Sequence, residues 1–345
     1  MLSRVAERVY WMARYAERAE NTARIINVYT NLLLDLPRNL AIGWHPLVDI
    51  TGTSELFDEL ISVDSERNIV RFLMADQRNP ASIINSLVYA RENARTIRDI
   101  IPREGWEQIN DLYLQTKAQL PTALSRRNRY EFLSFLIGGV QRLTGLLAGT
   151  MTHNHGYHFV RIGRNLERAD MTSRILDTMS VNLFPKEHVE VEALSYILWM
   201  SILNSLSAYQ SYRQEVQTAV THDSVVKFIL HHRNFPRAIY HCLCEIQNSL
   251  QQLPRHMRSI RYINRVMRKI EHVDVSELQD KHLRDFMDEL QRNFAMLNAV
   301  LASTYFDVSE KKPKPVRRTT AGHKKKGGSK PVSGQAASVK SLATV

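Results

Sequence analysis

Cysteine, glycine and proline are scarce in this chain of 345 residues, and each shortage narrows the possible structures. The two cysteines, Cys242 and Cys244, are two positions apart, which on a helix points them away from each other and argues against a disulfide. Two thiols in a chain of this size fit a reducing compartment. Residues 1–310 hold nine glycines and eight prolines, and alternating strand patterns bounded by turn residues are almost absent. The shortages therefore argue against a disulfide framework and against a sheet.

Long apolar runs are also missing. The N-terminus carries charge at Arg4, Glu7 and Arg8, where an export signal needs an apolar run. The longest uncharged stretch, about 193–212, is interrupted by serine, asparagine and glutamine, so it suits a buried helix better than a membrane span. We therefore expect a soluble cytoplasmic protein that does not contact a membrane.

Acidic residues are absent from the C-terminal segment 311–345, which holds ten lysines and arginines. Without these ten, 36 of the 46 basic residues remain against 35 acids, so the net charge of +11 falls to about +1 for residues 1–310. A body of this balance lacks the clustered basic excess that a nucleic-acid-binding domain needs. We expect 307–345 to be a disordered basic tail that binds polyanions weakly and non-specifically. A nucleic-acid-associated role through this tail is the weakest functional alternative.

Apolar residues recur at helical spacing over most of residues 1–306. Pro80, Pro121, Pro185 and Pro236 each precede such a run, as expected for proline in the first turn of a helix. The pattern predicts an all-α protein. The expected helices are 3–34, 45–61, 65–76, 80–100, 104–120, 129–151, 156–180, 187–216, 223–232, 236–252, 256–272 and 276–305.

Two segments resemble each other at an offset of 150 residues. Residues 14–25 and 164–175 are identical at seven of twelve positions, and an eighth position exchanges Glu20 for Asp170. An internal repeat of this kind indicates a duplicated structural unit.

A second similarity follows in the same order, at an offset of 156, between residues 70–87 and 226–243. The two similarities together predict a tandem duplication of a helical half. We expect a first half at 1–151 and a second half at 152–306, packed as one domain around an approximate two-fold axis.

The repeated segments carry a motif of acids and arginines. Its residues are Arg14, Glu17, Arg18 and Glu20 in the first copy, and Arg164, Glu167, Arg168 and Asp170 in the second. Because Glu-Arg keeps its register while neighbouring positions differ, we expect the two pairs to meet inside the molecule or to line a cleft. In the structural form, Glu17 bridges Arg168 and Glu167 bridges Arg18; in the functional form, the arginines grip a carboxylate or phosphate. A solvated helix face with internal pairing is the alternative.

The run from Glu7 to Arg24, followed by Leu-Glu-Arg-Ala-Asp at 166–170, resembles the bacterial alpha-E domain family, an all-helical family named for its Glu-Arg motif. Residues 79–83 and 90–95 also resemble the pattern of that family, so the likeness extends over about 1–306. Members are encoded beside, or fused to, a circularly permuted ATP-grasp ligase, and transglutaminase-like and proteasome-like peptidases are frequent neighbours.

The resemblance implies an accessory role in a system that makes, attaches or trims peptides. A non-catalytic subunit that binds a ligase or peptidase partner is the leading hypothesis. The alternative is an enzyme in which Glu17 or Glu167 acts as a general base on an anionic or peptide substrate.

A metal centre and an arginine stripe are the remaining candidates for a site. A di-iron bundle needs Glu-x-x-His on two helices, and none of the thirteen histidines follows a glutamate by three positions, so we expect neither metal nor cofactor. The helix near 255–268 carries a stripe of arginines that can dock an acidic partner or a polyphosphate, or pair with acids of adjacent helices. The stripe consists of Arg255, Arg258, Arg261, Arg265 and Arg268.

Overall fold

The structure, a computed structural model, describes residues 1–36, 42–182 and 191–307, and within these ranges it contains fourteen α-helices and no strand. The helices are α1 (Ser3–Asp35), α2 (Pro46–Thr51), α3 (Ser54–Leu60), α4 (Glu66–Met74), α5 (Ile83–Arg95), α6 (Arg103–Ala123), α7 (Arg126–Thr150), α8 (His155–Asn182), α9 (Val191–Ser205), α10 (Tyr209–Glu215), α11 (His222–His231), α12 (Ile239–Gln251), α13 (Met257–His272) and α14 (Asp280–Leu301). The predicted all-α class is confirmed. Apart from Asp307, the predicted tail lies outside the described residues.

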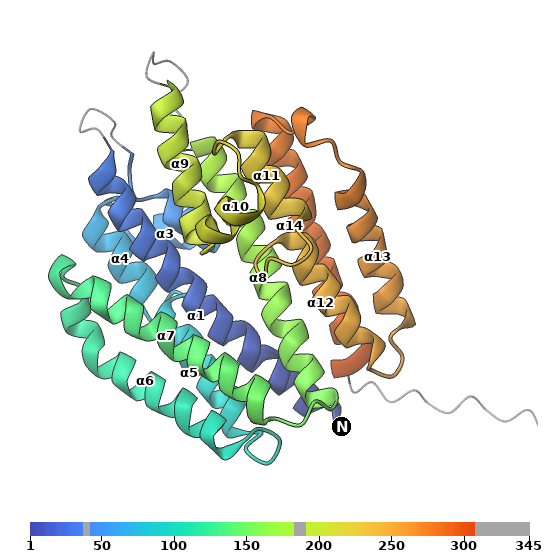
Figure 1. Cartoon of the computed structure of the whole chain (residues 1–345). Coiled ribbons are helices and arrows are strands. Elements are labelled where there is room, and N and C mark those ends of the chain that lie inside the picture. The colour runs from blue at the N-terminus through green and yellow to red at the C-terminus, as the bar shows by residue number, and fades with distance from the viewer. Residues whose placement is uncertain (37–41, 183–190, 308–345) are drawn as a thin grey trace, which may run out of the picture. The chain divides into compact units, whose positions relative to one another are not determined.

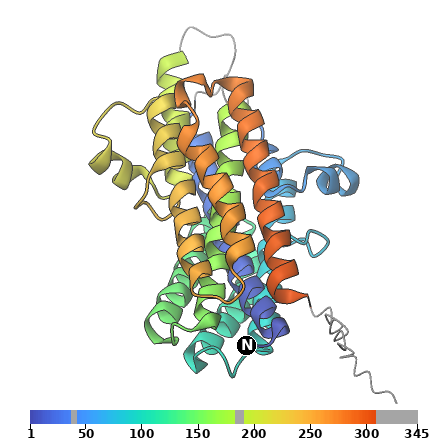
Figure 2. The same cartoon turned by 90° about the vertical axis from the view of Figure 1, so that its right-hand side faces the viewer.

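Two long helices, α1 and α8, form the centre of the bundle (Figure 1). On one side α5 and α7 pack against α1, with α6 outside them; on the other side α12 and α14 pack against α8, with α13 outside them. Figure 2 is viewed onto this second side. Two shorter helices contact the central helix of the other side: α9 packs on α1, and α2 packs on α8.

The two sides show the same order of helices. α4 and α5 begin at Glu66 and Ile83, and α11 and α12 begin 156 residues later, at His222 and Ile239. α6 and α7 then follow α5 as α13 and α14 follow α12. The predicted duplication requires this order, but the duplication and its boundary at 151–152 stay predictions.

Small residues allow α1 and α8 to approach closely. Ala19 and Ala169 are fully buried in the core. At Gly163 a Cβ atom would stand 2.4 Å from the carbonyl oxygen of Tyr10, which is closer than side chains tolerate. Glycine is therefore required there despite its low helix propensity. This close packing brings the charged motifs of the two helices within reach of each other.

Two predicted helices are each divided in two. Gly52 has a φ of 68°, and this left-handed conformation ends α2 within the helix expected at 45–61. Ser207, with a φ of 52°, separates α9 from α10 within the helix expected at 187–216, of which residues 187–190 lie outside the described ranges.

The expectation for Pro121 is also wrong, because this proline lies in the last turn of α6 and not before a new helix. The helix continues past it because Leu120 and Ala123 both bury their side chains. Pro185 lies outside the described residues.

Among the described helices, α7 alone is long and apolar enough to cross a membrane. Its buried face, which includes Leu133, Leu136 and Leu143, packs against α1 and α6. Its opposite face exposes Glu131 and Arg142. This amphipathic pattern is that of a core helix, and we assign α7 to the bundle.

A buried glutamate and arginine cluster between the central helices

The central helices α1 and α8 run parallel to each other. This follows from their contacts, because residues later in α1 contact residues later in α8. The Tyr10 carbonyl lies against Gly163, and further along Arg14 and Arg18 both contact Glu167. Residues three and four apart share a helix face, so the motif of α1 lies on the side that faces α8.

Glu167 of α8 is held by two arginines of α1. Arg14 Nε donates to its Oε2 at 2.6 Å, while Arg18 donates through Nε to Oε1 at 2.6 Å and through Nη2 to Oε2 at 3.1 Å. The Arg18 contact is the bidentate fork that guanidinium and carboxylate groups favour. The side chain of Glu167 is 2% exposed, and it pairs with a buried arginine, Arg14, and a half-buried one, Arg18.

Arg14 also links this pair to α14. Its Nη1 donates to Asn298 Oδ1 at 3.2 Å and to the hydroxyl of Tyr10 at 3.4 Å, and the Tyr10 hydroxyl donates to the same Asn298 oxygen at 2.6 Å. Neither Tyr10 nor Asn298 was among the predicted site residues, since neither belongs to the repeated motif and Asn298 is 284 positions from Arg14.

Glu17 of α1 also accepts from two arginines, but they come from different elements. Arg168 Nε of α8 and Arg237 Nη1 both donate to its Oε1 at 2.8 Å. Arg237 immediately precedes Ala238, the N-cap of α12, and is buried. Its counterpart at the offset of 156 is Ala81, so the repeat search could not find this arginine.

Arg237 spans more than one acceptor. Its Nη1 donates to Asn21 Oδ1 at 2.6 Å, and its Nη2 donates to Glu20 Oε1 at 2.7 Å. Arg24 donates to the same Glu20 oxygen at 2.5 Å and to the hydroxyl of Ser207 at 2.5 Å. The cluster thus joins α1 to the start of α12 and to the turn after α9.

The electrostatics of the cluster favour full ionisation. Burial alone would raise the pKa of Glu167, but Arg14 and Arg18 outweigh it and lower that pKa to about 2. Burial also opposes ionisation of Glu17, and Arg168 and Arg237 overcome it and lower its pKa to about 2. Both carboxylates are therefore charged at neutral pH.

Arg164 and Asp170 behave differently from their counterparts Arg14 and Glu20. Arg164 forms no hydrogen bond or ion pair with another described residue, its Nε is buried without a partner, and burial lowers its pKa. Asp170 accepts from Arg174 Nε at 3.2 Å, one turn along its own helix. Neither residue bridges the two helices through a hydrogen bond.

Of the eight predicted motif residues, the structure brings six into the cluster. These are Arg14, Glu17, Arg18, Glu20, Glu167 and Arg168. Both expected cross-pairs, Glu17 with Arg168 and Glu167 with Arg18, are present. Of the two alternatives, meeting inside the molecule or lining a cleft, the described residues show the first. Side chains of α7 pack beside Glu17 and Arg164 and leave a cavity of about 20 Å³, room for one water molecule.

Comparison with known proteins gives one family. Residues 1–306 match the family described as "Alpha-E: a predicted alpha-helical domain with a conserved ER motif". The chain belongs to the Alpha-E family. Glu17-Arg18 and Glu167-Arg168 both carry the ER dipeptide that this description names.

Relatives of this Alpha-E chain include uncharacterized proteins of Mycobacterium bovis and Mycobacterium tuberculosis strain CDC 1551, each 23% identical over 314 residues. The alignment covers 83% of this chain but 34% of each relative, so the chain spans about a third of the length of the relatives it matches. No solved structure matches the chain.

Four arginines of the stripe in this Alpha-E chain lie on α13, and Arg255 lies two residues before it. Arg255 lies over the ring of Tyr305 at 6.0 Å, Arg258 donates to Ser303 at 3.5 Å, and Arg261 donates to the Met257 carbonyl at 3.3 Å. All five arginines are exposed, and none of them, Arg265 and Arg268 included, lies within 4 Å of a carboxylate of the described residues. The alternative in which they pair with acids of adjacent helices is therefore wrong for the described part of the chain.

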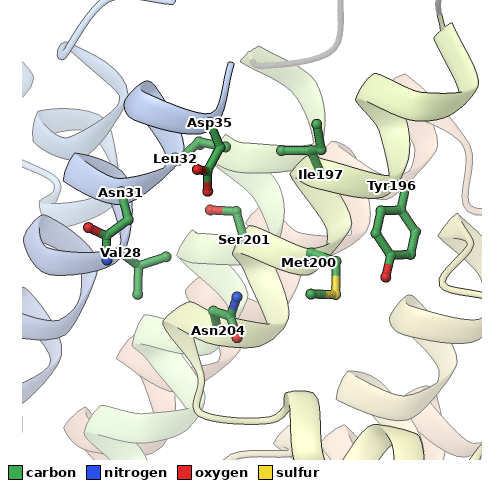
Figure 3. A pocket seen from close by; sticks show the side chains of 9 residues that line it. All are labelled: Val28, Asn31, Leu32, Asp35, Tyr196, Ile197, Met200, Ser201 and Asn204. Carbon is green, nitrogen blue, oxygen red and sulfur yellow. The ribbon is translucent and has the colours of Figure 1, made fainter.

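A larger hollow of about 410 Å³ opens between the C-terminal part of α1 and α9 (Figure 3). Figure 3 shows Asp35 and Ser201 directed into the space between the two helices, with Tyr196 at its edge. Within the described ranges, no group of three or more His, Cys, Asp or Glu side chains is placed to hold a metal ion.

Proposed function

We propose that this chain is a non-catalytic, accessory helical subunit of a bacterial peptide-synthesis or peptide-modification system. It works in the cytoplasm with a circularly permuted ATP-grasp ligase. The observation that carries the proposal is the closed and ionised state of the Glu-Arg cluster.

A general base needs a pKa near the working pH and access to its substrate. Glu17 and Glu167 have neither, since each has a pKa of about 2 and is buried, and the cavity of about 20 Å³ beside Glu17 admits no peptide. The cluster instead acts as a lock that fixes α1 against α8, α12 and α14. Buried ion pairs of this kind set a unique packing more reliably than they add stability. These features support the accessory subunit over an enzyme that uses the cluster.

The lengths of the relatives also support an accessory role. Because the alignment covers 34% of each mycobacterial relative, their matched region is covalently joined to a longer chain. A helical unit that occurs inside longer proteins is compatible with a role in which it binds another domain and assists it. The ligase as partner, and transglutaminase-like or proteasome-like peptidases as further partners, come from the family resemblance. The nucleic-acid alternative depends on the tail, which apart from Asp307 lies outside the described residues.

Co-expression of the full chain with the ATP-grasp protein encoded beside it tests the proposal. We expect a stable complex in size-exclusion chromatography with light scattering, and ATP-dependent ligation only when the ligase is present. Release of ADP or cleavage of peptides by the chain alone would contradict the non-catalytic role. Failure of the two proteins to associate at micromolar concentration would contradict the partnership.

A further inference from the structure

The hollow between α12 and α13 has an unusual lining. It measures about 550 Å³ and is lined by three arginines of the stripe on α13, Arg261, Arg265 and Arg268. α12 and α13 lie on the outer side of the bundle that faces the viewer in Figure 2. The hollow is therefore open to a partner and separate from the buried cluster.

The three arginines keep their charges available because the nearby acids have other partners. Glu271, the one acid in the lining, accepts from the hydroxyl of Tyr240 and from Arg233 Nη2 at 3.4 Å. Glu289 pairs with Lys269. The lining thus presents three guanidinium groups to solvent against one occupied carboxylate.

Amide groups complete the lining. Gln247 Nε2 donates to Asn264 Oδ1 at 2.5 Å, which uses one polar atom of each side chain. The amide oxygen of Gln247 and the amide nitrogen of Asn264 remain to bind a donor and an acceptor. Such a pair matches the N–H and C=O groups of an extended peptide backbone.

The spacing of the arginines fits acidic side chains on a peptide. Seven residues of helix place the stems of Arg261 and Arg268 about 10 Å apart. Carboxylates on alternate residues of an extended peptide are about 7 Å apart, so two or three acidic residues span the row. The aromatic ring in this lining, that of Tyr240, already has Arg233 over one face at 4.7 Å from its centre, which disfavours the site as a base-stacking platform for nucleic acid.

We propose that the hollow between α12 and α13 binds an acidic peptide segment of a partner protein, with Arg261, Arg265 and Arg268 gripping its carboxylates. The chain's own tail is not the occupant, since residues 311–345 carry ten bases and no acid. The inference concerns a different surface from the cluster and stands whether or not the partner is a ligase.

Fluorescence anisotropy with a labelled hexaglutamate peptide tests this site in the full chain at physiological salt. The triple variant Arg261→Gln/Arg265→Gln/Arg268→Gln should weaken binding at least about tenfold. A matched control, Arg4→Gln/Arg127→Gln/Arg142→Gln, removes the same charge from exposed positions elsewhere and should weaken it less than about twofold. Replacing the three stripe arginines with lysine keeps the charge but loses the forked geometry, and should give an intermediate affinity.

An equal loss in the stripe and control variants would overturn the proposal, because binding would then follow net charge or the tail. An oligothymidylate or polyphosphate of equal charge that binds more tightly than hexaglutamate, and loses that affinity in the stripe variant, would also overturn it. Hexaglutamine serves as the neutral probe and should not bind. Circular dichroism of each variant checks folding, and the exposed positions of all six arginines lead us to expect unchanged spectra.

Discussion

Glu17 and Glu167 stand at equivalent positions of the two motifs, 150 residues apart, yet their surroundings differ. Glu167 takes both of its arginines from one facing helix, α1. Glu17 takes Arg168 from the facing helix and Arg237 from the start of α12. The same glutamate therefore takes its arginines from one element on one side and from two elements on the other.

The difference also appears in the arginine one turn before each glutamate. Arg14 pairs with Glu167, whereas Arg164 makes no hydrogen bond with a described residue, and Arg237 supplies the second guanidinium that Glu17 needs. A repeated sequence pattern thus fixes the acids, while the tertiary fold decides which arginines satisfy them. Substitutions at these equivalent positions measure how much the two sides differ.

The largest effect should follow Glu167→Gln, because it removes the carboxylate that pairs with the buried Arg14 and the half-buried Arg18. We expect a loss of about 3–5 kcal/mol in the free energy of unfolding, measured by urea denaturation. Glu107→Gln, which breaks the exposed pair with Arg103, is the control and should change stability little. A similar small loss for Glu167→Gln would mean that the cluster is not a lock.

The contribution of Glu17 and Glu167 to stability should also appear in the unmodified chain, as a loss of stability at low pH. The pKa of Glu17 and of Glu167 falls from 4.5 to about 2 on folding, so their stabilisation is complete above pH 4.5 and is lost as the pH falls toward 2. Each contributes about 3 kcal/mol over that range. Urea denaturation at a series of pH values measures the loss.

Asp177 should have the opposite effect from the two glutamates: it should raise stability as the pH falls, and it should do so at a higher pH, between about 6 and 4. Burial, with Asp288 nearby, raises its pKa to about 6 in the folded chain from an ordinary 3.8. The folded state then binds the extra proton between pH 4 and 6, and stability rises as the pH falls through that range. Asp177→Asn should remove this rise and leave the loss below pH 4. The loss below pH 4 is assigned to Glu17 and Glu167. If Glu167→Gln lost stability below pH 4 as steeply as the unmodified chain, this assignment to Glu167 would be contradicted.

The central helices and the cross-pairs could be predicted from the sequence for a simple physical reason. The expected ranges 3–34 and 156–180 are close to Ser3–Asp35 and to His155–Asn182, because uninterrupted helical spacing is a local signal. A register kept between two copies also predicts which residues face each other once the helices pack. The predicted ion pair between Glu17 and Arg168 is therefore present in the structure.

The rest depends on contacts that no local pattern encodes. Arg237, just before α12, and Asn298 of α14 reach the cluster from 220 and 284 positions away, outside the repeated motif. The break at Ser207 requires a left-handed backbone at a residue type that rarely adopts it, whereas Gly52 offered a readable signal for the other break. Tertiary packing imposed both the extra partners and the break at Ser207.

A smaller loss is expected for Glu17→Gln than for Glu167→Gln. Arg237 would keep Glu20 and Asn21 as acceptors, so Arg168 alone loses its carboxylate. We expect about 2–3 kcal/mol in urea denaturation, toward or below the lower end of the range for breaking a buried pair. The double variant Glu17→Gln/Glu20→Gln also removes the remaining carboxylate of Arg237 and should bring the loss close to that of Glu167→Gln. Equal losses for the two single variants would show that Glu20 and Asn21 do not compensate for Arg237.

The smallest effect should come from Arg164→Met, and its contrast with Arg14→Met is the sharpest test of the difference between the two motifs. Arg164 has a buried Nε without a partner, and burial lowers its pKa, so an apolar side chain of similar length removes an unmet desolvation cost. We expect a change of less than about 1 kcal/mol in either direction. Arg14→Met instead removes the bond to Glu167 and the link to Asn298, and should cost at least about 2 kcal/mol in the same urea experiment. If the two substitutions cost the same, the two motifs are energetically equivalent, and the asymmetry seen in their hydrogen bonds has no thermodynamic weight.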